Sequence, residues 1–540
     1  MSRTDGAAGP KRLILADPLL PEGLDVLRAT TALAVEDHTN DDRAALAGAL
    51  RGASGLIVRS RTKVDAELID ASDALEVIGR AGAGVDNIDM AAATRRGIAV
   101  LNAPAANTFS TAELAFALLL AVARHIPEAD RGVRAGEWNR KGLRGTQLCG
   151  KTLAVLGAGR IGSEVIRRGR AFGMRVLAHD PYVTAERAND LGVELVELDE
   201  LLASAEVLTI HVPLTEENRG LIGTEEIARM PQGALLVNAA RGGVVDEAAV
   251  ARALESGHLG GAGLDVYERE PLPSDSPLRR APNVVLTPHI GASTAEAQRE
   301  VSRQIAVAVR DALLSSDYQA ALNAPYESGE RGRVAPVMEL GRRLGTLLAQ
   351  LDDGRRRRIE VRYGGAVAGV LRPLAAAALE GFLSPRVEPP INVVNALSIA
   401  AERGIEVARV RTGQVGDYTN HVELRASAAD GVDSVTVGGA LLGDGQHARI
   451  VRIGQFHVDT VPRGTVLLIR NRDVPGVIGE VGTKLGRAGV NIAEYHQART
   501  EAGGDALGVV TVDGEVPRSV LEDLRSLPAV ESVRQVIFSD

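Results

Sequence analysis

The chain has 540 residues, which is too long for a single hydrophobic core, since domains average roughly 150 residues and three or four are therefore expected. Hydrophobic residues make up 45% and charged residues 24% of the sequence, a composition typical of globular proteins. The formal net charge of -9 argues against a dedicated nucleic-acid binder, which would carry clustered basic residues.

The only cysteine, Cys149, excludes an internal disulfide and a cysteine-based zinc site, and we predict no metal centre. We expect this thiol to be a buried small hydrophobe in a protein of a reducing compartment. The N-terminus carries no secretory signal pattern. Together these features predict a cytoplasmic protein.

The longest apolar run, residues 114–123, is far shorter than the roughly 20 residues that cross a bilayer, so we expect no membrane contact. It is predicted to be a core helix. Ser110 and Glu113 precede it with the spacing of a capping box, which predicts that the helix begins there.

Two α/β units are predicted in the first 320 residues. In residues 12–104 short apolar segments alternate with helical patterns, and the strands are expected at LILA, GLIVRS, LEVIGRAG and IAVLNAP. After residue 123 the alternation resumes with six more strands, KTLAVLGAG, RVLAHD, VLTIHVPL, ALLVNAA, GAGLDV and NVVLTPH. This pattern favours two Rossmann-like parallel sheets. An amphipathic helix from residue 295 is assigned to the first unit, which makes that domain discontinuous.

Turn-forming residues collect near residues 323–332, and the regular alternation of strands and helices ends there. Mixed helices and strands follow, which predicts an α+β domain, and the last 75 residues or so read β-α-β-β-α-β, a ferredoxin-like unit. The predicted domains are residues 1–104 with 296–322, residues 105–295, residues 323–462 and residues 463–540.

The segment LGAGRIG follows an apolar strand and opens a helix, which is the context of a dinucleotide-binding loop. Gly157 permits the tight turn, Gly159 lets the backbone approach a pyrophosphate, and Gly162 allows close packing of helix on strand. Asp180 ends the next strand, where a carboxylate accepts hydrogen bonds from ribose hydroxyls and repels a 2′-phosphate. NAD is therefore favoured over NADP.

Three polar residues at strand ends of the same unit fit oxidation of a 2-hydroxy acid. Arg241 can hold a carboxylate with a bidentate fork. His289 can accept the hydroxyl proton near neutral pH, and Glu270 can orient the imidazole. These residues are the predicted catalytic trio.

The segments VRSRTKV, GRAGAGVDNID, LGAGRIG, HVPLT, NAARGGVVDE, LDVYEREP and PHIGAST resemble the D-isomer-specific 2-hydroxyacid dehydrogenase family. Within that family the chain is similar to the long-form D-3-phosphoglycerate dehydrogenases, which implies 3-phosphoglycerate as substrate, 3-phosphohydroxypyruvate as product and a role in opening L-serine biosynthesis. The resemblance implies further NAD-binding residues, namely Arg160, Ile161, Pro213, Ala240, Asp265 and Gly291.

The catalytic trio is shared by enzymes that act on glycerate, lactate and glyoxylate. A site for a phosphorylated acid therefore needs additional cations that bind the phosphate. Arg59, Ser60 and Arg80 match family positions that contact substrate, together with Arg241 and His289. Trp138 and its basic neighbours match a segment that reaches toward a neighbouring subunit. A glyoxylate/hydroxypyruvate reductase, a D-lactate dehydrogenase and an NAD-sensing scaffold are the alternative functions.

The C-terminal segment RNRDVPGVIGEVGTKLGRAGVNI resembles the ACT regulatory domain. By that resemblance Asn471, Asp473 and Asn491 match positions that bind L-serine, although Asn471 replaces a residue with a ring. The resemblance implies serine regulation and a homotetramer. The alternative is an ACT module that serves oligomerisation alone.

Overall fold

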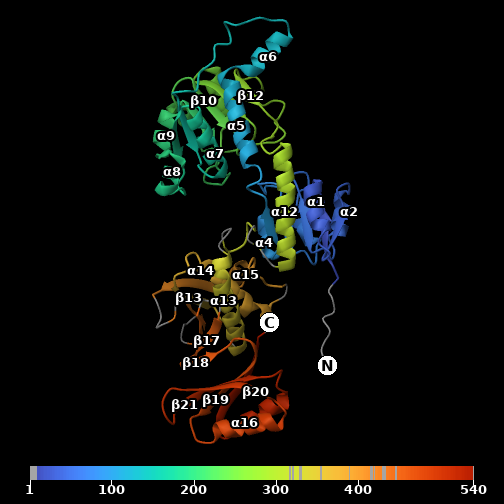
Figure 1. The fold of residues 1–540 in the computed structure, drawn as a ribbon, viewed down its shortest axis with the longest axis vertical. Coiled ribbons are helices and arrows are strands. Elements are labelled where there is room, and N and C mark those ends of the chain that lie inside the picture. The colour runs from blue at the N-terminus through green and yellow to red at the C-terminus, as the bar shows by residue number, and fades with distance from the viewer. Residues whose placement is uncertain are drawn as a thin grey trace.

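The computed structural model describes residues 9–315, 318, 321–326, 331–352, 356–387, 390–413, 418, 420–428, 433–443 and 447–538. Four units follow one another along the long axis of the molecule, and the segment around α6 projects at one end (Figure 1). The predicted fold class is confirmed: two units are built on parallel sheets, the third is α+β, and the fourth is ferredoxin-like.

The first unit is a five-stranded parallel sheet in the order β2-β1-β3-β4-β5. Its elements are β1 (Lys11–Leu15), α1 (Pro21–Arg28), β2 (Leu33–Asp37), α2 (Arg43–Ala49), β3 (Gly55–Val58), α3 (Ala66–Asp70), β4 (Val77–Arg80), α4 (Met90–Arg95) and β5 (Ala99–Asn102). The sequence did not predict β2. This strand lies at the edge of the sheet and fully buries only Leu33, so it lacks the apolar run of the central strands.

Helix α12 (Ala295–Ser315) follows the second unit in sequence but lies beside α1 of the first unit in Figure 1. It packs against α1 and β4. The contact is close. A methyl group added at Gly79 would collide with Val309, and one added at Gly23 would collide with Ser302. The helix thereby links the two α/β units.

The second unit is a seven-stranded parallel sheet in the order β12-β11-β10-β9-β6-β7-β8, which contains the Rossmann arrangement with its switch point between β6 and β9. Its strands are β6 (Thr152–Leu156), β7 (Arg175–His179), β8 (Glu194–Leu195), β9 (Val207–Ile210), β10 (Ala234–Asn238), β11 (Leu259–Leu264) and β12 (Val284–Leu286). Its helices are α5 (Thr108–Ala123), α6 (Ile126–Arg134), α7 (Arg160–Ala171), α8 (Ala185–Leu191), α9 (Leu198–Ser204), α10 (Thr224–Arg229) and α11 (Glu247–Glu255), with the 3-10 turn η1 (Pro277–Arg279).

Two local predictions in this unit are wrong. The capping box does not form, because α5 begins at Thr108 and Ser110 lies inside the helix, where its hydroxyl donates to the carbonyl oxygen of Gly291. Cys149 is exposed rather than buried, because it lies in a loop before β6.

The third unit places helices against a six-stranded sheet in the order β14-β13-β15-β16-β17-β18. Its helical elements are α13 (Arg331–Leu351), α14 (Leu371–Leu383), η2 (Ser384–Arg386) and α15 (Ala396–Glu402). Its strands are β13 (Arg358–Gly365), β14 (Glu406–Thr412), β15 (Asn420–Ser427), β16 (Ser434–Leu442), β17 (His447–Ile453) and β18 (Phe456–Thr460). Helices α13 and α14 cross at glycines, where Gly345 lies against the backbone of Ala378 and Gly381 against that of Arg342.

The fourth unit is an antiparallel sheet in the order β20-β21-β19-β22 with two helices on one face. Its elements are β19 (Gly464–Arg472), α16 (Val477–Arg487), β20 (Ile492–Arg499), β21 (Asp505–Val512), α17 (Arg518–Arg525) and β22 (Val530–Phe538). Leu467 and Ile469 face the helices, whereas Val466 and Leu468 join the core of the third unit. Strand β19 is therefore buried on both faces.

Across the part of the chain that the structure describes, no single helix is long and apolar enough to cross a membrane, although the bent pair α5 and α6 meets that test of length and composition together.

The glycine contact between α13 and α14 predicts a large effect of one methyl group. Gly345→Ala should destabilise the protein by about 3 kcal/mol, because the new Cβ collides with the backbone of Ala378. Gly332→Ala is the matched control in the same helix, since no described atom lies within 4 Å of its Cβ. Urea unfolding of both variants measures the difference, and equal stability would contradict the packing described.

Candidate active site

A cavity of 570 Å³ lies between the two α/β units, at the carboxyl ends of their strands. Open α/β sheets bind their ligands at this edge. The predicted site residues that line it are Arg59, Ser60, Arg80, Arg160, Ile161, Pro213, Ala240, Arg241, Asp265, Glu270, His289 and Gly291. The structure therefore brings together side chains that are up to 230 residues apart, since Arg59 and His289 face the same space.

The glycine loop between β6 and α7 has the shape that a dinucleotide requires. Gly157 has φ +92°, which an L side chain rarely adopts, and a methyl group at Gly162 would collide with the carbonyl oxygen of Gly157. A methyl group added at Gly159 would have no described atom within 4 Å, so the backbone there is open to a close-lying phosphate.

Asp180 follows β7 and holds this loop. Its carboxylate accepts hydrogen bonds from the backbone N–H of Ala158 at 2.9 Å and of Tyr182 at 2.9 Å. It does not line the 570 Å³ cavity, but it lies beside the glycine turn, where the adenosine ribose of a dinucleotide binds. The residues present fit NAD.

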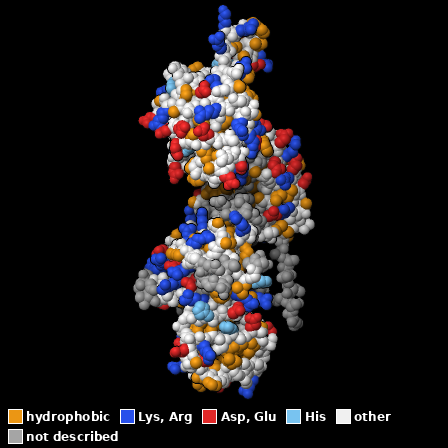
Figure 2. Space-filling model, turned by 60° about the vertical axis from the view of Figure 1, so that its left-hand side comes forward, with side chains coloured by type: hydrophobic (Ala, Val, Ile, Leu, Met, Phe, Trp, Pro, Cys, Tyr) orange, Lys and Arg blue, Asp and Glu red, His pale blue; other side chains and the backbone are white. Residues whose placement is uncertain are grey.

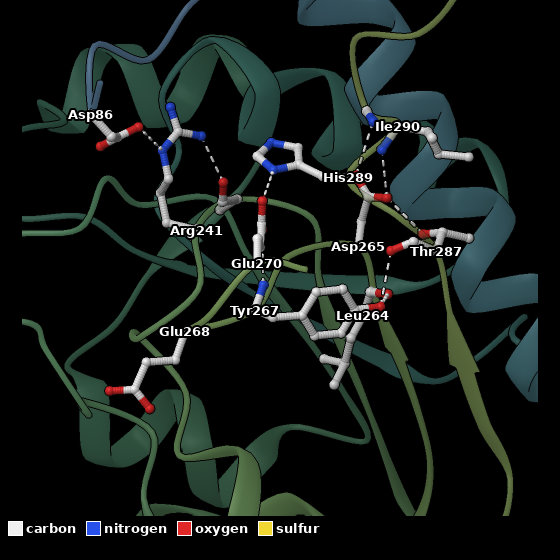
Figure 3. Close-up of polar contacts among 12 residues, drawn as sticks. Asp86, Arg241, Leu264, Asp265, Tyr267, Glu268, Glu270, Thr287, His289 and Ile290 are labelled. Atoms are coloured by element: carbon white, nitrogen blue, oxygen red, sulfur yellow. Dashed lines mark hydrogen bonds and ion pairs between the residues drawn. The ribbon is translucent and has the colours of Figure 1, made fainter. Parts of the chain in front are cut away.

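His289 and Glu270 form the hydrogen-bonded pair that the sequence predicts. The imidazole Nδ1 lies 2.8 Å from Glu270 Oε2, and the other carboxylate oxygen accepts the backbone N–H of Tyr267 at 3.1 Å (Figure 3). Because Nδ1 is engaged, Nε2 is the ring nitrogen that is left to exchange a proton with a ligand. Glu268 lies two residues before Glu270, and its side chain points away from the imidazole (Figure 3).

The loop that carries His289 is held by Asp265, which is fully buried at the end of β11. The Asp265 carboxylate accepts hydrogen bonds from Thr287 Oγ1 at 2.6 Å, Ile290 N at 2.8 Å and Gly291 N at 2.9 Å (Figure 3). His289 has φ +54°, a left-handed conformation that costs about 1–2 kcal/mol for an L residue. Hydrogen bonds to a charged group contribute about 1.5–3 kcal/mol each, so Asp265 outweighs this strain.

Arg241 follows β10 and reaches into the same cavity. Its Nε lies 3.6 Å from Asp86 of the first unit, and its Nη1 donates to the carbonyl oxygen of Ala240 at 2.7 Å (Figure 3). The turn is fixed by Asn238, whose side chain bonds both the carbonyl oxygen of Arg241 and the N–H of Ala240. The remaining guanidinium N–H groups are placed to bind an anion.

Arg80 lies between two other guanidinium groups. Burial, the charge of Arg241 and the charge of Arg59 lower its pKa, although Asp86 and Asp17 act in the opposite direction. Its buried Nε has no hydrogen-bond partner among the described residues. Three cations that face one cavity form a site for an anion with more than one charge.

His211 also lines the cavity, and the sequence reasoning missed its environment. Its Nε2 lies 2.8 Å from Thr209 Oγ1, and its buried Nδ1 has no partner in the described part of the chain. Burial lowers its pKa to about 4, so it is neutral at physiological pH. Its position directly after β9 was the available signal, because ligands meet these strands at their ends.

The predicted regulatory residues are not brought together within one chain. Asn471 is buried and bonds the backbone of Arg472, while Asp473 pairs with Arg499 at 2.9 Å. The Arg499 guanidinium lowers the pKa of Asp473. Asn491 donates to Asp513 instead, and no hydrogen bond between described residues joins it to the other two.

Comparison with known proteins places this geometry in a family. The model of the D-isomer specific 2-hydroxyacid dehydrogenase, NAD binding domain, matches residues 116–291. That of the D-3-phosphoglycerate dehydrogenase intervening domain matches residues 333–454, and that of the ACT domain matches residues 465–529.

Relatives named D-3-phosphoglycerate dehydrogenase match over nearly the full length. The protein of Synechocystis sp. is 39% identical over 528 residues, which cover 97% of this chain and 94% of the relative. The protein of Archaeoglobus fulgidus is 41% identical, and the match covers 96% of this chain and 98% of the relative. That of Mycobacterium tuberculosis H37Rv is 42% identical, and the match covers 94% of this chain and 96% of the relative.

The chain belongs to the D-3-phosphoglycerate dehydrogenases. It is thus an NAD-dependent oxidoreductase of the D-isomer-specific 2-hydroxyacid dehydrogenase family. Among solved structures, the TT0316 protein of Thermus thermophilus is 39% identical with a TM-score of 0.52, and covers 56% of this chain and 97% of its own. A glyoxylate reductase of Paecilomyes thermophila is 33% identical with a TM-score of 0.54, and covers 58% and 99%.

The imidazole of His289 and the carboxylate of Glu270 form one hydrogen-bonded unit. Glu270→Gln should lower kcat by about 10- to 100-fold, because the amide cannot stabilise the charged imidazole, while NADH binding persists. Glu268→Gln is the matched control, since that carboxylate points away from His289 (Figure 3). Steady-state kinetics with both variants measures this, and equal losses would exclude the assigned role of Glu270.

Proposed function

We propose that the protein oxidises 3-phosphoglycerate to 3-phosphohydroxypyruvate with NAD, the first step of L-serine biosynthesis. The observation that carries this proposal is the buried Nε of Arg80, which has no hydrogen-bond partner among the described residues. It lines one cavity with Arg59, Arg241 and the His289–Glu270 pair. A substrate with a carboxylate at one end and a phosphate at the other satisfies all three guanidinium groups.

The cofactor is assigned to the glycine loop and its surroundings. The pyrophosphate meets the open backbone at Gly159 and the first turn of α7, and Asp180 receives the adenosine ribose. The residues assigned around the nicotinamide end are Pro213, Ala240, Asp265 and Gly291, with Arg160 and Ile161 at the loop. When bound, NAD supplies the acceptor for the C2 hydrogen.

The chain's own residues position the substrate and remove the proton. Arg241 holds the C1 carboxylate with its forked N–H groups, while Arg59, Ser60 and Arg80 hold the phosphate. His289 Nε2 accepts the proton of the C2 hydroxyl as the carbonyl forms, and Glu270 stabilises the charged ring through Nδ1.

The main competing function is reduction of an unphosphorylated acid, as the name of the Paecilomyes relative indicates for that protein. Such a substrate leaves the buried Arg80 without an anion, at a cost in binding. An NAD-sensing scaffold needs no catalytic pair at all, so the contact between His289 and Glu270 disfavours it.

Removing Arg80 should separate these functions. Arg80→Ala should lower kcat/KM for 3-phosphoglycerate by about 100-fold, equivalent to about 2.7 kcal/mol, because a charged contact with the phosphate is lost. The loss for D-glycerate should be much smaller. Arg96→Ala, which removes a half-buried arginine that lies outside the cavity and pairs with Asp70, is the control. Equal losses with the two acids would favour the unphosphorylated substrate.

We propose a homotetramer in the cytoplasm. The projecting segment around α6 buries none of its helical residues, and Ile126, Val133 and Trp138 are 52%, 57% and 80% exposed. Figure 2 shows hydrophobic and basic side chains together on this projection. A surface of this kind is stable in water when a second subunit covers it.

We propose four domains with the boundaries given by the sequence: residues 1–104 with 296–322, 105–295, 323–462 and 463–540. The packing of α12 on α1 and β4 supports the discontinuous first domain.

We propose that L-serine regulates the enzyme through the C-terminal domain, at a site between two copies of it. Asp473 and Asn491 supply the polar contacts, and a second copy is needed because one chain does not bring them together. Val474 and Ile478 are 45% and 51% exposed near the start of α16, at an end of the molecule where hydrophobic side chains gather in Figure 2.

Serine inhibition should depend on Asp473. Millimolar L-serine is expected to slow turnover of the wild type, and Asp473→Ala should abolish this response without lowering the uninhibited rate. Glu522→Gln, on the exposed face of α17, should keep the response. Initial rates with and without serine test this, and a wild type that ignores serine would leave the domain a purely oligomeric role.

A further inference from the structure

Another cavity, of 400 Å³, shares no lining residue with the cleft and lies where α13 and α14 meet Tyr318, Tyr326 and Asn392. Its walls include the apolar side chains of Met338 and Val393. Its volume is in the range of small-molecule sites, roughly 300–1,000 Å³. The site adjoins the contact between units, because Asn392 also lines it and donates to the carbonyl oxygen of Gly97 at 2.7 Å.

The charged groups in this cavity are incompletely paired. Arg342 binds Glu339 through Nε and Nη2 at 2.9 and 2.8 Å, and its Nη1 has no hydrogen-bond partner among the described residues. Glu380, on α14, receives no hydrogen bond at its carboxylate from the described residues. Among the described residues, the cavity therefore presents one carboxyl group and one guanidinium edge that have no hydrogen-bond partner.

Glu380 is costly for the fold. Burial raises its pKa to about 7, since the favourable charge of Arg342 is opposed by that of Glu339. The other titratable groups that face the cavity are the phenols of Tyr318 and Tyr326. Because the pKa is raised on folding, the stability contribution of this group falls as pH rises from the ordinary glutamate range to about 7. A glutamine would avoid this cost, whereas a bound cation would offset it.

We propose that this cavity binds a small α-amino acid, with its ammonium on the Glu380 carboxylate and its carboxylate on the free edge of Arg342. The ligand's side chain then lies against Met338 and Val393. This site is separate from Asp473 and Asn491 of the fourth unit.

Calorimetric titration of the full chain at about pH 8 with glycine, L-alanine, L-serine and L-valine tests the proposal. At least one is expected to bind, and methylammonium and acetate, which each carry one end of the zwitterion, should bind more weakly. Glu380→Gln should weaken binding by about tenfold or more, as expected for the loss of one charged hydrogen bond. Glu402→Gln, on the exposed face of α15, is the charge-matched control and should bind normally.

Two further measurements keep the test decisive. The wild-type affinity should fall about tenfold per pH unit below about 7, because Glu380 must lose its proton to receive an ammonium. Thermal unfolding should show Glu380→Gln to be folded, and more stable than wild type at pH 8 but not at pH 5. Binding that survives in Glu380→Gln, binding that Asp473→Ala removes, or no binding of any of the four amino acids would overturn the proposal.

Discussion

The active site depends on one buried carboxylate. Asp265 directly follows β11 and accepts hydrogen bonds from three donors in residues 287–291, which fixes that segment in a conformation that a histidine rarely adopts. Without those bonds the left-handed backbone at His289 would relax. The imidazole would then lose its fixed position beside Glu270, which lies in a different loop.

The cleft concentrates positive charge because two parallel sheets point their carboxyl ends at each other. Arg80 ends a strand of one sheet, and Arg241 follows a strand of the other. Helix α12 maintains this arrangement. Gln298, in its first turn, accepts from Arg59 and donates to the carbonyl oxygen of Ala292 at 2.8 Å, so one side chain contacts both walls of the cleft.

The third unit is held by close backbone packing and by a buried ion pair between Arg356 and Asp352. Gly345 and Gly381 allow α13 and α14 to touch, and the inner face of the last sheet packs onto the third unit through Val466 and Leu468. Such a contact transmits displacement, because packed interiors deform little. Glu380 lies in this packed region without a hydrogen bond from any of the residues that the structure describes.

The sequence by itself determined the kind of structure and chemistry. The alternation of apolar strands with helices, the glycine loop at Gly157 and the β-α-β-β-α-β order each follow from local constraints, so each was readable. The pairing of His289 with Glu270 was also predicted from residue type and position at strand ends.

Only the tertiary structure decided what depends on neighbours distant in sequence. The edge strand β2 has too little apolar pattern to be predicted, and Ser110 lies inside α5, where its hydroxyl bonds a residue about 180 positions away instead of capping the helix. The buried neutrality of His211 and the loop-holding contacts of Asp265 arise the same way. Periodicity records which face of an element is buried, but the distance between strand ends is set by the order of strands in the finished sheet.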